Sequence, residues 1–338
     1  MTDSTQLPKA AAPKVAILLY GMLRTFRITA PSFHRHVVSP NNADVFYFGP
    51  EASDTPSVAH KGQPDMFGNI KINPKGKVDA VNPVPKDAFV SAYAPALRQY
   101  RLHTVEQEEF VRQAAIVDRQ EWIFGLNPAR MFSMVFNMEG AVHLLEEYER
   151  DHQVRYDYVI ITRPDLAFFS PIKVGGRTGQ IHVPSGEGFD EWGKKFLINA
   201  RVLYYKNVAT GDYLQGGDHI HFNDQIFVLR RDDLTCFSGL TKAMTDYLAN
   251  KVPASPETVF YLHLCQRHGL KPVYHPEWCY EIYRPGMPLV QNVADTSMIA
   301  LVDRYHAKAR ERFRKNPMSS LLRDVKRLTR KVIHRITR

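Results

Sequence analysis

Cysteine is scarce in this chain of 338 residues, which contains three, and long apolar runs are missing. Three cysteines cannot build a disulfide framework, and such sparse usage indicates a reducing compartment. Spanning a bilayer takes about 18 consecutive apolar residues, whereas the run from Val15 to Tyr20 is much shorter. Residues 1–13 are polar, rich in alanine and proline, and lack a signal-peptide pattern, so we expect a disordered leader. These features predict a cytoplasmic protein.

Several catalytic signatures are also absent. The sequence contains no P-loop, no G-x-G-x-x-G, no H-E-x-x-H and no G-x-S-x-G pattern, and it shows no internal repeat. ATP hydrolysis through a P-loop, dinucleotide redox chemistry and serine-hydrolase chemistry therefore have no support in the sequence.

The net charge of +9 is concentrated at one end of the chain. Residues 301–338 contain 13 Lys and Arg against 3 acids, a net of +10, which leaves 31 basic and 32 acidic residues, or −1, for residues 1–300. Any argument for an anionic partner of high charge therefore belongs to the tail.

The tail has an amphipathic pattern after Pro317. Lys and Arg occupy most of the positions between its apolar residues. The apolar residues recur at helical spacing and are Leu321, Leu322, Val325, Leu328, Val332 and Ile336. This pattern predicts a basic helix over residues 318–338 that binds an anionic membrane surface, as a peripheral protein would on the inner face of the cell membrane. A helix packed on the body of the protein and a disordered segment that binds nucleic acid without sequence specificity remain alternatives.

The body, residues 14–300, starts with a strand–helix–strand pattern. Lys14 to Tyr20 predicts a buried strand that breaks at Gly21, Pro31 to Val38 predicts a short helix, and Ala43 to Phe48 predicts a second strand. Such βαβ units form parallel sheets, so we expect an α/β fold with a mainly parallel open sheet flanked by helices. A glycine directly after a first strand suits a loop that approaches a phosphate or a base. An ordinary turn with a solvated Arg24 explains the same residues.

A long helix and two loops follow. Asn127-Pro128 is a helix-start signal, and an apolar stripe with three- and four-residue spacing follows it. Arg130 and Asn137 lie on another face of this helix, where a solvated surface is the ordinary interpretation. Gly49 to Lys86 and Gly175 to Gly193 are rich in turn-forming residues and predict loops.

The most informative stretch is Tyr156 to Pro171. Its β-branched run from Val159 to Thr162 ends abruptly at Arg163-Pro164-Asp165. Because a buried strand that ends in charged residues delivers them to the carboxyl edge of a sheet, we expect the active site there.

Two later stretches add carboxylates. Asn223-Asp224-Gln225 precedes the apolar run that starts at Ile226, and Ser255-Pro256-Glu257 has the pattern of a helix start. Capping alone explains Glu257 as well as a role at the site does. His219 and His221 are weaker candidates. A zinc site has to be considered among the following residues, although their spacing is atypical: His263, Cys265, His268, His275 and Cys279.

These stretches resemble the GT-A glycosyltransferases, and most of all the bacterial GT-A-like enzymes of lipopolysaccharide and capsule synthesis. In those enzymes a strand ends in an acidic D-x-D motif, which holds the diphosphate of a nucleotide sugar through Mn²⁺ or Mg²⁺. Here the first acid is replaced by Arg163, which leaves Asp165 as the expected metal ligand, with His275 as a second. The resemblance spans residues 14–285 and implies that Gly49 to Lys86 covers the active site.

The resemblance also implies roles for individual residues. It places Gly21, Arg24, Arg130, Asn137, Arg163 and Asp165 at the nucleotide-sugar donor. It makes Asp224 the carboxylate that takes the acceptor proton, with Glu257 beside it. The expected function is sugar transfer to a surface glycan or a lipid-linked acceptor. The alternatives are a non-catalytic sugar- or nucleotide-binding relative and an adaptor that acts through the basic tail.

Overall fold

The computed structural model describes the residues in eight ranges: 12–51, 84–104, 107–122, 127–184, 187–189, 195–197, 222–275 and 277–282. The chain divides into two compact units, Met1–Ala294 and Asp295–Arg338, and all described residues belong to the first. The basic tail, His219 and His221 therefore lie outside the described residues, as do most of the leader and most of the loop predicted over Gly49 to Lys86.

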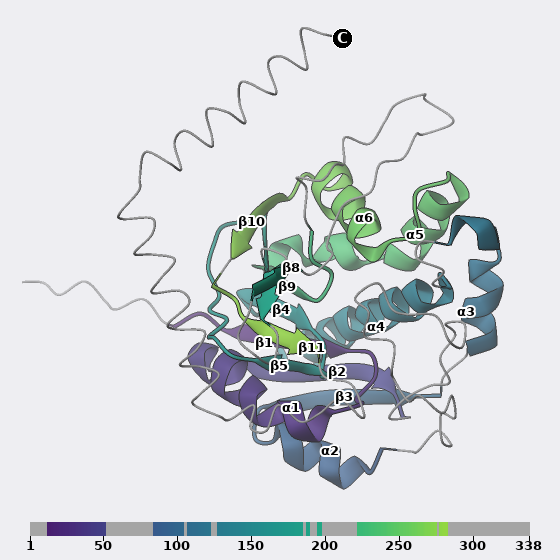
Figure 1. The fold of residues 1–338 in the computed structure, drawn as a ribbon. Helices are drawn as coiled ribbons and strands as arrows, with labels where there is room; N and C mark the ends of the chain where they lie inside the picture. The colour runs from purple at the N-terminus through teal and green to yellow at the C-terminus, as the bar shows by residue number, and fades with distance from the viewer. Residues whose placement is uncertain are drawn as a thin grey trace, which may run out of the picture. The chain divides into compact units, whose positions relative to one another are not determined.

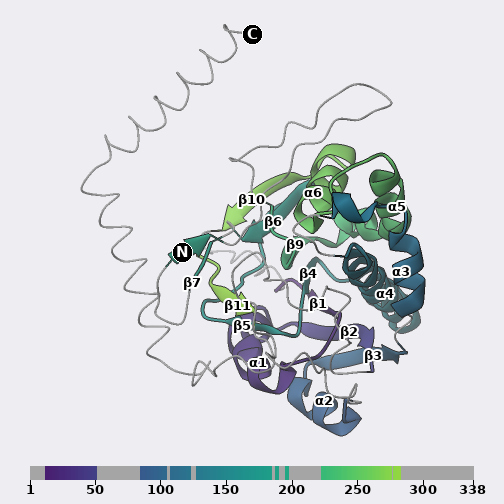
Figure 2. The same cartoon turned by 45° about the vertical axis from the view of Figure 1, so that its right-hand side comes forward.

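A seven-stranded mixed sheet forms the centre of the first unit, with helices on both faces (Figures 1 and 2). The strand order is β10-β6-β9-β4-β1-β2-β3. The strands span, in chain order, Val15–Tyr20 (β1), Asp44–Pro50 (β2), Leu97–His103 (β3), Tyr158–Thr162 (β4), Gln180–Pro184 (β6), Ile226–Arg230 (β9) and Lys271–His275 (β10). Only β9 runs antiparallel to its neighbours, β4 and β6, so the other six strands share one direction.

The α-helices are Phe26–Phe33 (α1), Lys86–Tyr93 (α2), Gln107–Ala114 (α3), Ala129–His152 (α4), Leu240–Ala249 (α5) and Pro256–Phe260 (α6). Shorter helical turns cover His34–Val38 (η1), Ser39–Asn41 (η2), Arg119–Glu121 (η3), Arg231–Phe237 (η5) and Tyr261–Arg267 (η6). Two small antiparallel pairs complete the described elements: Leu166–Phe168 (β5) with Tyr280–Ile282 (β11), and Glu187–Phe189 (β7) with Lys195–Leu197 (β8).

The packing of β1 explains why its sequence is apolar at every position. Ala16, Leu18 and Tyr20 pack with α4 and α5 in one core cluster, and Val15, Ile17 and Leu19 pack with α1 and α2 in the other. Because helices cover both faces of the sheet, neither set of alternating side chains meets water, and a continuous apolar run results.

The predicted α/β class with a mainly parallel sheet is confirmed. The first two strands and the start of α4 are also confirmed, where the Asn127 side chain accepts a hydrogen bond from the Ala129 N–H at 2.9 Å. The helix predicted over Pro31 to Val38 is wrong in its bounds, because α1 begins at Phe26 and contains Pro31. Proline has no N–H to donate to the preceding turn, and the chain continues from His34 as a π-helix.

The loop predicted over Gly175 to Gly193 is also wrong in part, because β6 and β7 lie inside it. The buried β-branched residues of β6 are only Ile181 and Val183, which is too few to give a pattern in the sequence. Pairing with β9 on one side and β10 on the other makes the segment a strand.

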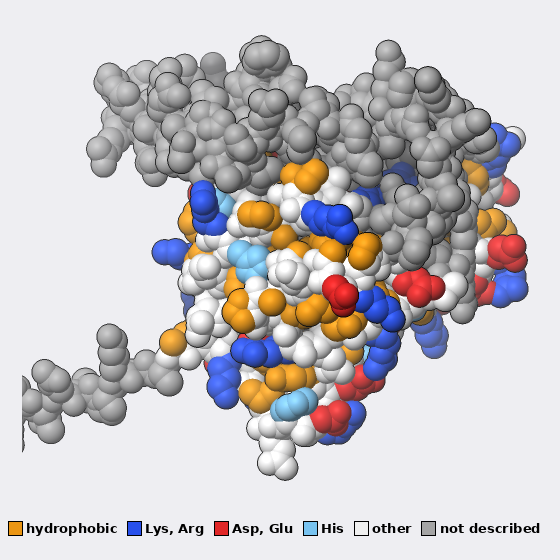
Figure 3. Space-filling model, turned by 90° about the horizontal axis from the view of Figure 1, so that it is seen from below, with side chains coloured by type: hydrophobic (Ala, Val, Ile, Leu, Met, Phe, Trp, Pro, Cys, Tyr) orange, Lys and Arg blue, Asp and Glu red, His pale blue; other side chains and the backbone are white. Residues whose placement is uncertain are grey.

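The surface shows apolar side chains scattered among charged ones on the face seen in Figure 3. Among the described residues, the large exposed apolar ones come from separate parts of the chain and are 37–43% exposed: Ile28, Val90, Tyr100, Val111, Ile116, Phe136 and Tyr274. Single residues of this kind are ordinary on a protein surface. Within the described ranges, no helix is both long and apolar enough to cross a bilayer.

Candidate active site at the carboxyl edge of the sheet

Three segments far apart in the sequence leave the sheet at one edge. Thr162, the last residue of β4, pairs with Leu19 of β1 on one side and with Ile226, the first residue of β9, on the other. Because β9 runs in the opposite direction, the residues before it lie at the same edge as the residues after β1 and β4. Gly21, Arg163 and Asp224 are therefore neighbours along this edge.

The turn after β1 depends on two glycines. Gly21 has a φ of +83°, a left-handed conformation that favours glycine. Its carbonyl oxygen accepts a hydrogen bond from the Tyr47 hydroxyl at 2.7 Å, and its N–H donates to the Phe48 carbonyl at 3.2 Å. A Cβ on Gly49 would collide with the Tyr47 hydroxyl and with the Gly21 carbonyl oxygen. Gly21 and Gly49 therefore allow the close backbone packing of the turn that leads to Arg24.

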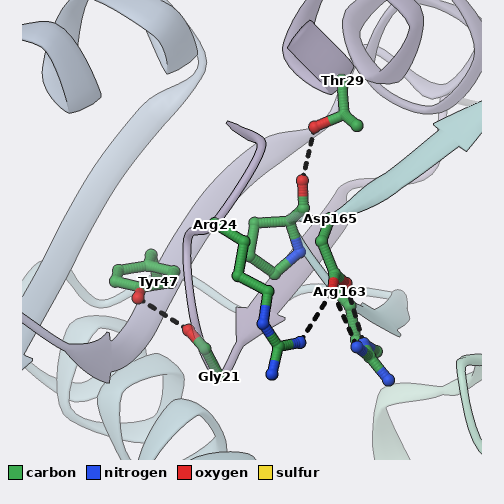
Figure 4. Close-up of polar contacts among 7 residues, drawn as sticks. Gly21, Arg24, Thr29, Tyr47, Arg163 and Asp165 are labelled. Carbon is green, nitrogen blue, oxygen red and sulfur yellow. Dashed lines mark hydrogen bonds and ion pairs between the residues drawn. The ribbon is translucent and has the colours of Figure 1, made fainter. Parts of the chain in front are cut away.

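Asp165 is fully buried and is held by two arginines (Figure 4). Arg163 donates from Nε to Oδ1 at 2.9 Å and from Nη2 to Oδ2 at 2.8 Å. Arg24 donates from Nη1 to Oδ2 at 2.9 Å, and its φ of +37° is uncommon for a residue with a side chain. Backbone strain of this kind is found most often at functional sites. The loop is fixed further by the Thr29 hydroxyl, which donates to the Pro164 carbonyl at 2.6 Å.

A third guanidinium group belongs to the same electrostatic cluster. Arg130 lies in the first turn of α4 and is exposed. Desolvation by the surrounding protein is the main cause that lowers the pKa of Arg130, followed by the positive charges of Arg24 and Arg163. The negative charges of Asp224 and Glu257 raise it. For Arg163, burial works to lower the pKa, but Asp165 outweighs it and holds the pKa above the usual arginine range. The predicted donor residues Arg24, Arg130 and Arg163 are thus brought together.

Asp224 is buried beside these arginines. Its backbone carbonyl accepts a hydrogen bond from the Tyr20 hydroxyl at 3.0 Å. Burial raises the pKa of the Asp224 carboxyl, and the charges of Arg163 and Arg130 only partly counter that effect.

Glu257 is the second carboxylate of the site. Ser255 stands before α6 as predicted, but its hydroxyl donates to Glu257 Oε2 at 2.5 Å and does not cap the helix. Burial, followed by the negative charge of Asp224, raises the pKa of Glu257. The effect of Asp224 on Glu257 indicates that the two carboxyl groups lie near each other, which is a common arrangement for acid–base chemistry.

Tyr280 and Asn223 complete the described site and were not predicted from the sequence. Asn223 Nδ2 donates to the Tyr280 hydroxyl at 2.6 Å, and Tyr280 is fully buried. Tyr280 arrives there because β11 pairs with β5, which follows Asp165 directly. A pairing between segments more than a hundred residues apart leaves no local signal in the sequence.

Two predicted residues have other partners. Asn137 is buried in α4, where its Nδ2 donates to the Ser133 carbonyl at 2.6 Å and its Oδ1 lies 2.9 Å from His103 Nε2. His275 ends β10 and lies within hydrogen-bond distance of Glu277 and His182, at 2.6 and 2.8 Å. Roles for Asn137 at the donor and for His275 at a metal remain predictions.

The residues around Asp165 bear on the expected metal site. Mg²⁺ and Mn²⁺ favour several carboxylate or other oxygen ligands around one ion. Within the described ranges, no group of three or more His, Cys, Asp or Glu side chains is arranged to hold a metal. At Asp165, guanidinium N–H groups already bond both oxygens. The described residues therefore do not fit the metal site that the D-x-D resemblance implies.

Comparison with models of protein families gives no match for this chain. No match was found among curated proteins either. The fold and site by themselves define an α/β protein with an arginine–carboxylate cluster at the carboxyl edge of a mixed sheet.

Proposed function

We propose that the chain is a glycosyltransferase that uses a nucleoside-diphosphate sugar and extends a bacterial surface glycan, in lipopolysaccharide or capsule synthesis. One observation carries the proposal. The sheet edge combines three guanidinium groups, which suit a diphosphate, with a pair of carboxyl groups of raised pKa, which suit proton transfer from a hydroxyl.

The proposed reaction is transfer of a glycosyl group. The acceptor hydroxyl oxygen forms a bond to the anomeric carbon, and the bond from that carbon to the diphosphate oxygen breaks. The electron pair of the broken bond leaves with the diphosphate, where Arg24 and Arg163 stabilise the added negative charge. The acceptor proton passes to Asp224. Glu257 holds the pair's other proton or exchanges roles with Asp224.

The basic tail extends the proposal to the cell membrane. A lipid-linked acceptor is presented at a membrane surface, and residues 318–338 have the amphipathic, cationic pattern that binds anionic lipid. Cytoplasmic location on the inner face of the cell membrane is part of this proposal.

A non-catalytic nucleotide-sugar-binding protein is the second candidate. It is favoured by Arg163, which stands where the resembling enzymes have an acid. Such a protein would bind nucleoside-diphosphate sugars but release no nucleoside diphosphate from them.

A turnover screen separates these functions. The full chain would be incubated with UDP-, GDP-, dTDP- and ADP-sugars, with lipid-linked and lipopolysaccharide-core acceptors, in EDTA, Mg²⁺ or Mn²⁺. Release of nucleoside diphosphate that depends on acceptor supports the transferase. Binding without release supports the second candidate, and neither binding nor release in any condition contradicts both.

Asp224→Asn tests the assignment of the base. Because a base acts in the transition state and the amide is nearly isosteric, we expect kcat to fall by at least a hundredfold while donor affinity changes less than threefold. Calorimetry gives the donor affinity. Arg155→Gln, which removes a surface ion pair with Asp232, is the control and keeps both values. A large loss of donor affinity with unchanged kcat would move Asp224 to the donor site.

A further inference from the structure

The contacts of Asp165 separate two ways of holding a diphosphate. In one, the carboxylate binds a metal and the metal binds the phosphates. In the other, the carboxylate holds cationic side chains and these bind the phosphates directly. The fully buried Asp165 has its Oδ1 bonded by Arg163 and its Oδ2 bonded by both Arg163 and Arg24. Figure 4 shows the two guanidinium groups converging on the carboxylate.

This arrangement opposes a divalent cation for a physical reason. A Mg²⁺ or Mn²⁺ ligated by Asp165 would lie about 2.1 Å from an oxygen that guanidinium nitrogens approach at 2.8–2.9 Å. The cation would therefore stand beside two fixed positive charges and compete with their hydrogen bonds. The position that carries the first acid of the D-x-D motif in the resembling enzymes is occupied here by one of these arginines, Arg163.

Arg163 keeps donors for another anion. Arg163 donates two of its five N–H groups to Asp165. Its side chain is 16% exposed and that of Arg24 is 23% exposed, so both are reached from outside. Arg130 is exposed and has no ion-pair partner among the described residues.

We propose that Arg24, Arg130 and Arg163 bind the diphosphate of the donor directly, without a divalent cation, and that Asp165 is a positioning residue that fixes two of these guanidinium groups. This inference rests on the proposed function and specifies how its donor is held. Arginine suits the role because its planar fork can bond a carboxylate on one side and phosphate oxygens on another, whereas lysine offers a single charged point.

Calorimetry on the full chain tests the proposal. The probes are UDP, GDP, dTDP and ADP, each titrated in EDTA, in Mg²⁺ and in Mn²⁺, with the matching nucleosides as controls for base recognition. For the tightest nucleotide, we expect affinities within threefold of one another in the three conditions. An affinity in EDTA more than tenfold weaker, restored by either metal, overturns the inference but leaves the proposed function standing. No binding of any nucleotide in any condition overturns both.

Substitutions assign the binding to the cluster. Arg130→Gln removes a cation that pairs with no described carboxylate, so it leaves the buried Asp165 contacts intact. We expect it to weaken nucleoside diphosphate binding in EDTA at least fivefold, with nucleoside binding unchanged. Arg163→Lys keeps the charge but loses the fork, and we expect at least a tenfold loss. Unchanged diphosphate affinity in both variants overturns the proposal.

Glu149→Gln is the matched control for Asp165→Asn. Glu149 is also a buried carboxylate that accepts from an arginine, Arg231, at 2.7 Å, but it lies in the last turns of α4 and outside the site. We expect Asp165→Asn to weaken diphosphate binding about tenfold and to leave it independent of metal. We expect Glu149→Gln to leave it unchanged. Equal losses of diphosphate affinity in the two variants would show that Asp165 only stabilises the fold, and would overturn its positioning role.

Discussion

At the scale of single residues, Asp165 combines a proposed role at the donor with ion pairing inside the protein, and the sequence does not separate the two. Its place after a buried strand predicts a carboxylate at the sheet edge that carries the candidate site. The structure adds two ion pairs with Arg24 and Arg163 around a fully buried side chain. Removing one partner of a buried pair leaves the other charge uncompensated.

We therefore expect Asp165→Ala to abolish transfer and also to lower the free energy of unfolding by about 3 kcal/mol, the usual cost of breaking a buried ion pair. Denaturant unfolding measures the stability, and nucleoside diphosphate release measures the activity. Normal turnover in a folded variant would show that the central motif has been misassigned.

The carboxyl pair predicts a pH dependence. Because the pKa of both Asp224 and Glu257 is raised, the pair retains a proton at a pH where an ordinary pair would have lost it. We expect kcat/KM to rise with pH as that proton leaves. In Glu257→Gln the second carboxyl group cannot titrate, so the change in kcat/KM that accompanies loss of the Glu257 proton should disappear. A profile that does not move would place Glu257 outside the proton transfer.

His263 gives a stability prediction away from the site. It is buried, its Nε2 lies 2.7 Å from the Cys236 carbonyl oxygen, and Tyr247 and His268 are its other polar neighbours. Burial lowers the pKa of His263 to about 4, and the charge of Arg267 adds to the effect. Above about pH 6.5 His263 is neutral in both the folded and the unfolded protein. Below that pH the unfolded chain binds a proton at His263 and the folded protein does not, so the free energy of unfolding falls.

We expect a loss of about 2–3 kcal/mol between pH 7 and pH 4.5 from this residue alone. His263→Gln cannot titrate, so urea unfolding of the variant should lose that much less over the same range. An equal loss in both proteins would contradict the assignment.

At the scale of elements, α4 packs on β2 through a glycine. Gly140, in the middle of the helix, faces the Phe48 ring, and a Cβ at this position would overlap the ring atoms. Alanine is the better helix former by about 1 kcal/mol, but overpacking a core costs about 1–3 kcal/mol.

We therefore expect Gly140→Ala to lower stability by about 1 kcal/mol, which is the difference between these opposing effects. Phe48→Leu makes room for the added methyl group. In a double-mutant cycle the two substitutions together should cost less than the sum of the single ones. A strictly additive cycle would show that the helix shifts to avoid the ring.

At the scale of the whole molecule, the tail and the body have different charges and different proposed partners. The tail lies outside the described residues, so its prediction rests on the sequence pattern. We expect the full chain to sediment with vesicles of anionic lipid and not with neutral vesicles. A chain shortened to Asn316 should lose this binding and keep turnover of soluble substrates, because Arg24, Asp165 and Asp224 belong to the body. Equal sedimentation of both chains would rule out the anchor.

The sequence by itself determined the elements whose signal is local. The run from Val15 to Tyr20 is apolar on both faces and predicted a covered strand, and Asn127-Pro128 predicted a helix start, with α4 beginning at Ala129. The switch from Thr162 to Arg163-Pro164-Asp165 placed charged groups at the end of a strand and so indicated the edge that carries the candidate site. Periodicity and capping depend on neighbours in the chain, which the sequence contains.

The tertiary structure alone decided which of these groups meet. The antiparallel direction of β9 brings Asp224 to the same edge as Asp165, and the pairing of β11 with β5 brings in Tyr280. The same packing turns Asp165 from an expected metal ligand into the partner of two arginines. Strand order, direction and ion pairing depend on contacts between distant segments, and the free energy of those contacts is not encoded in any local pattern.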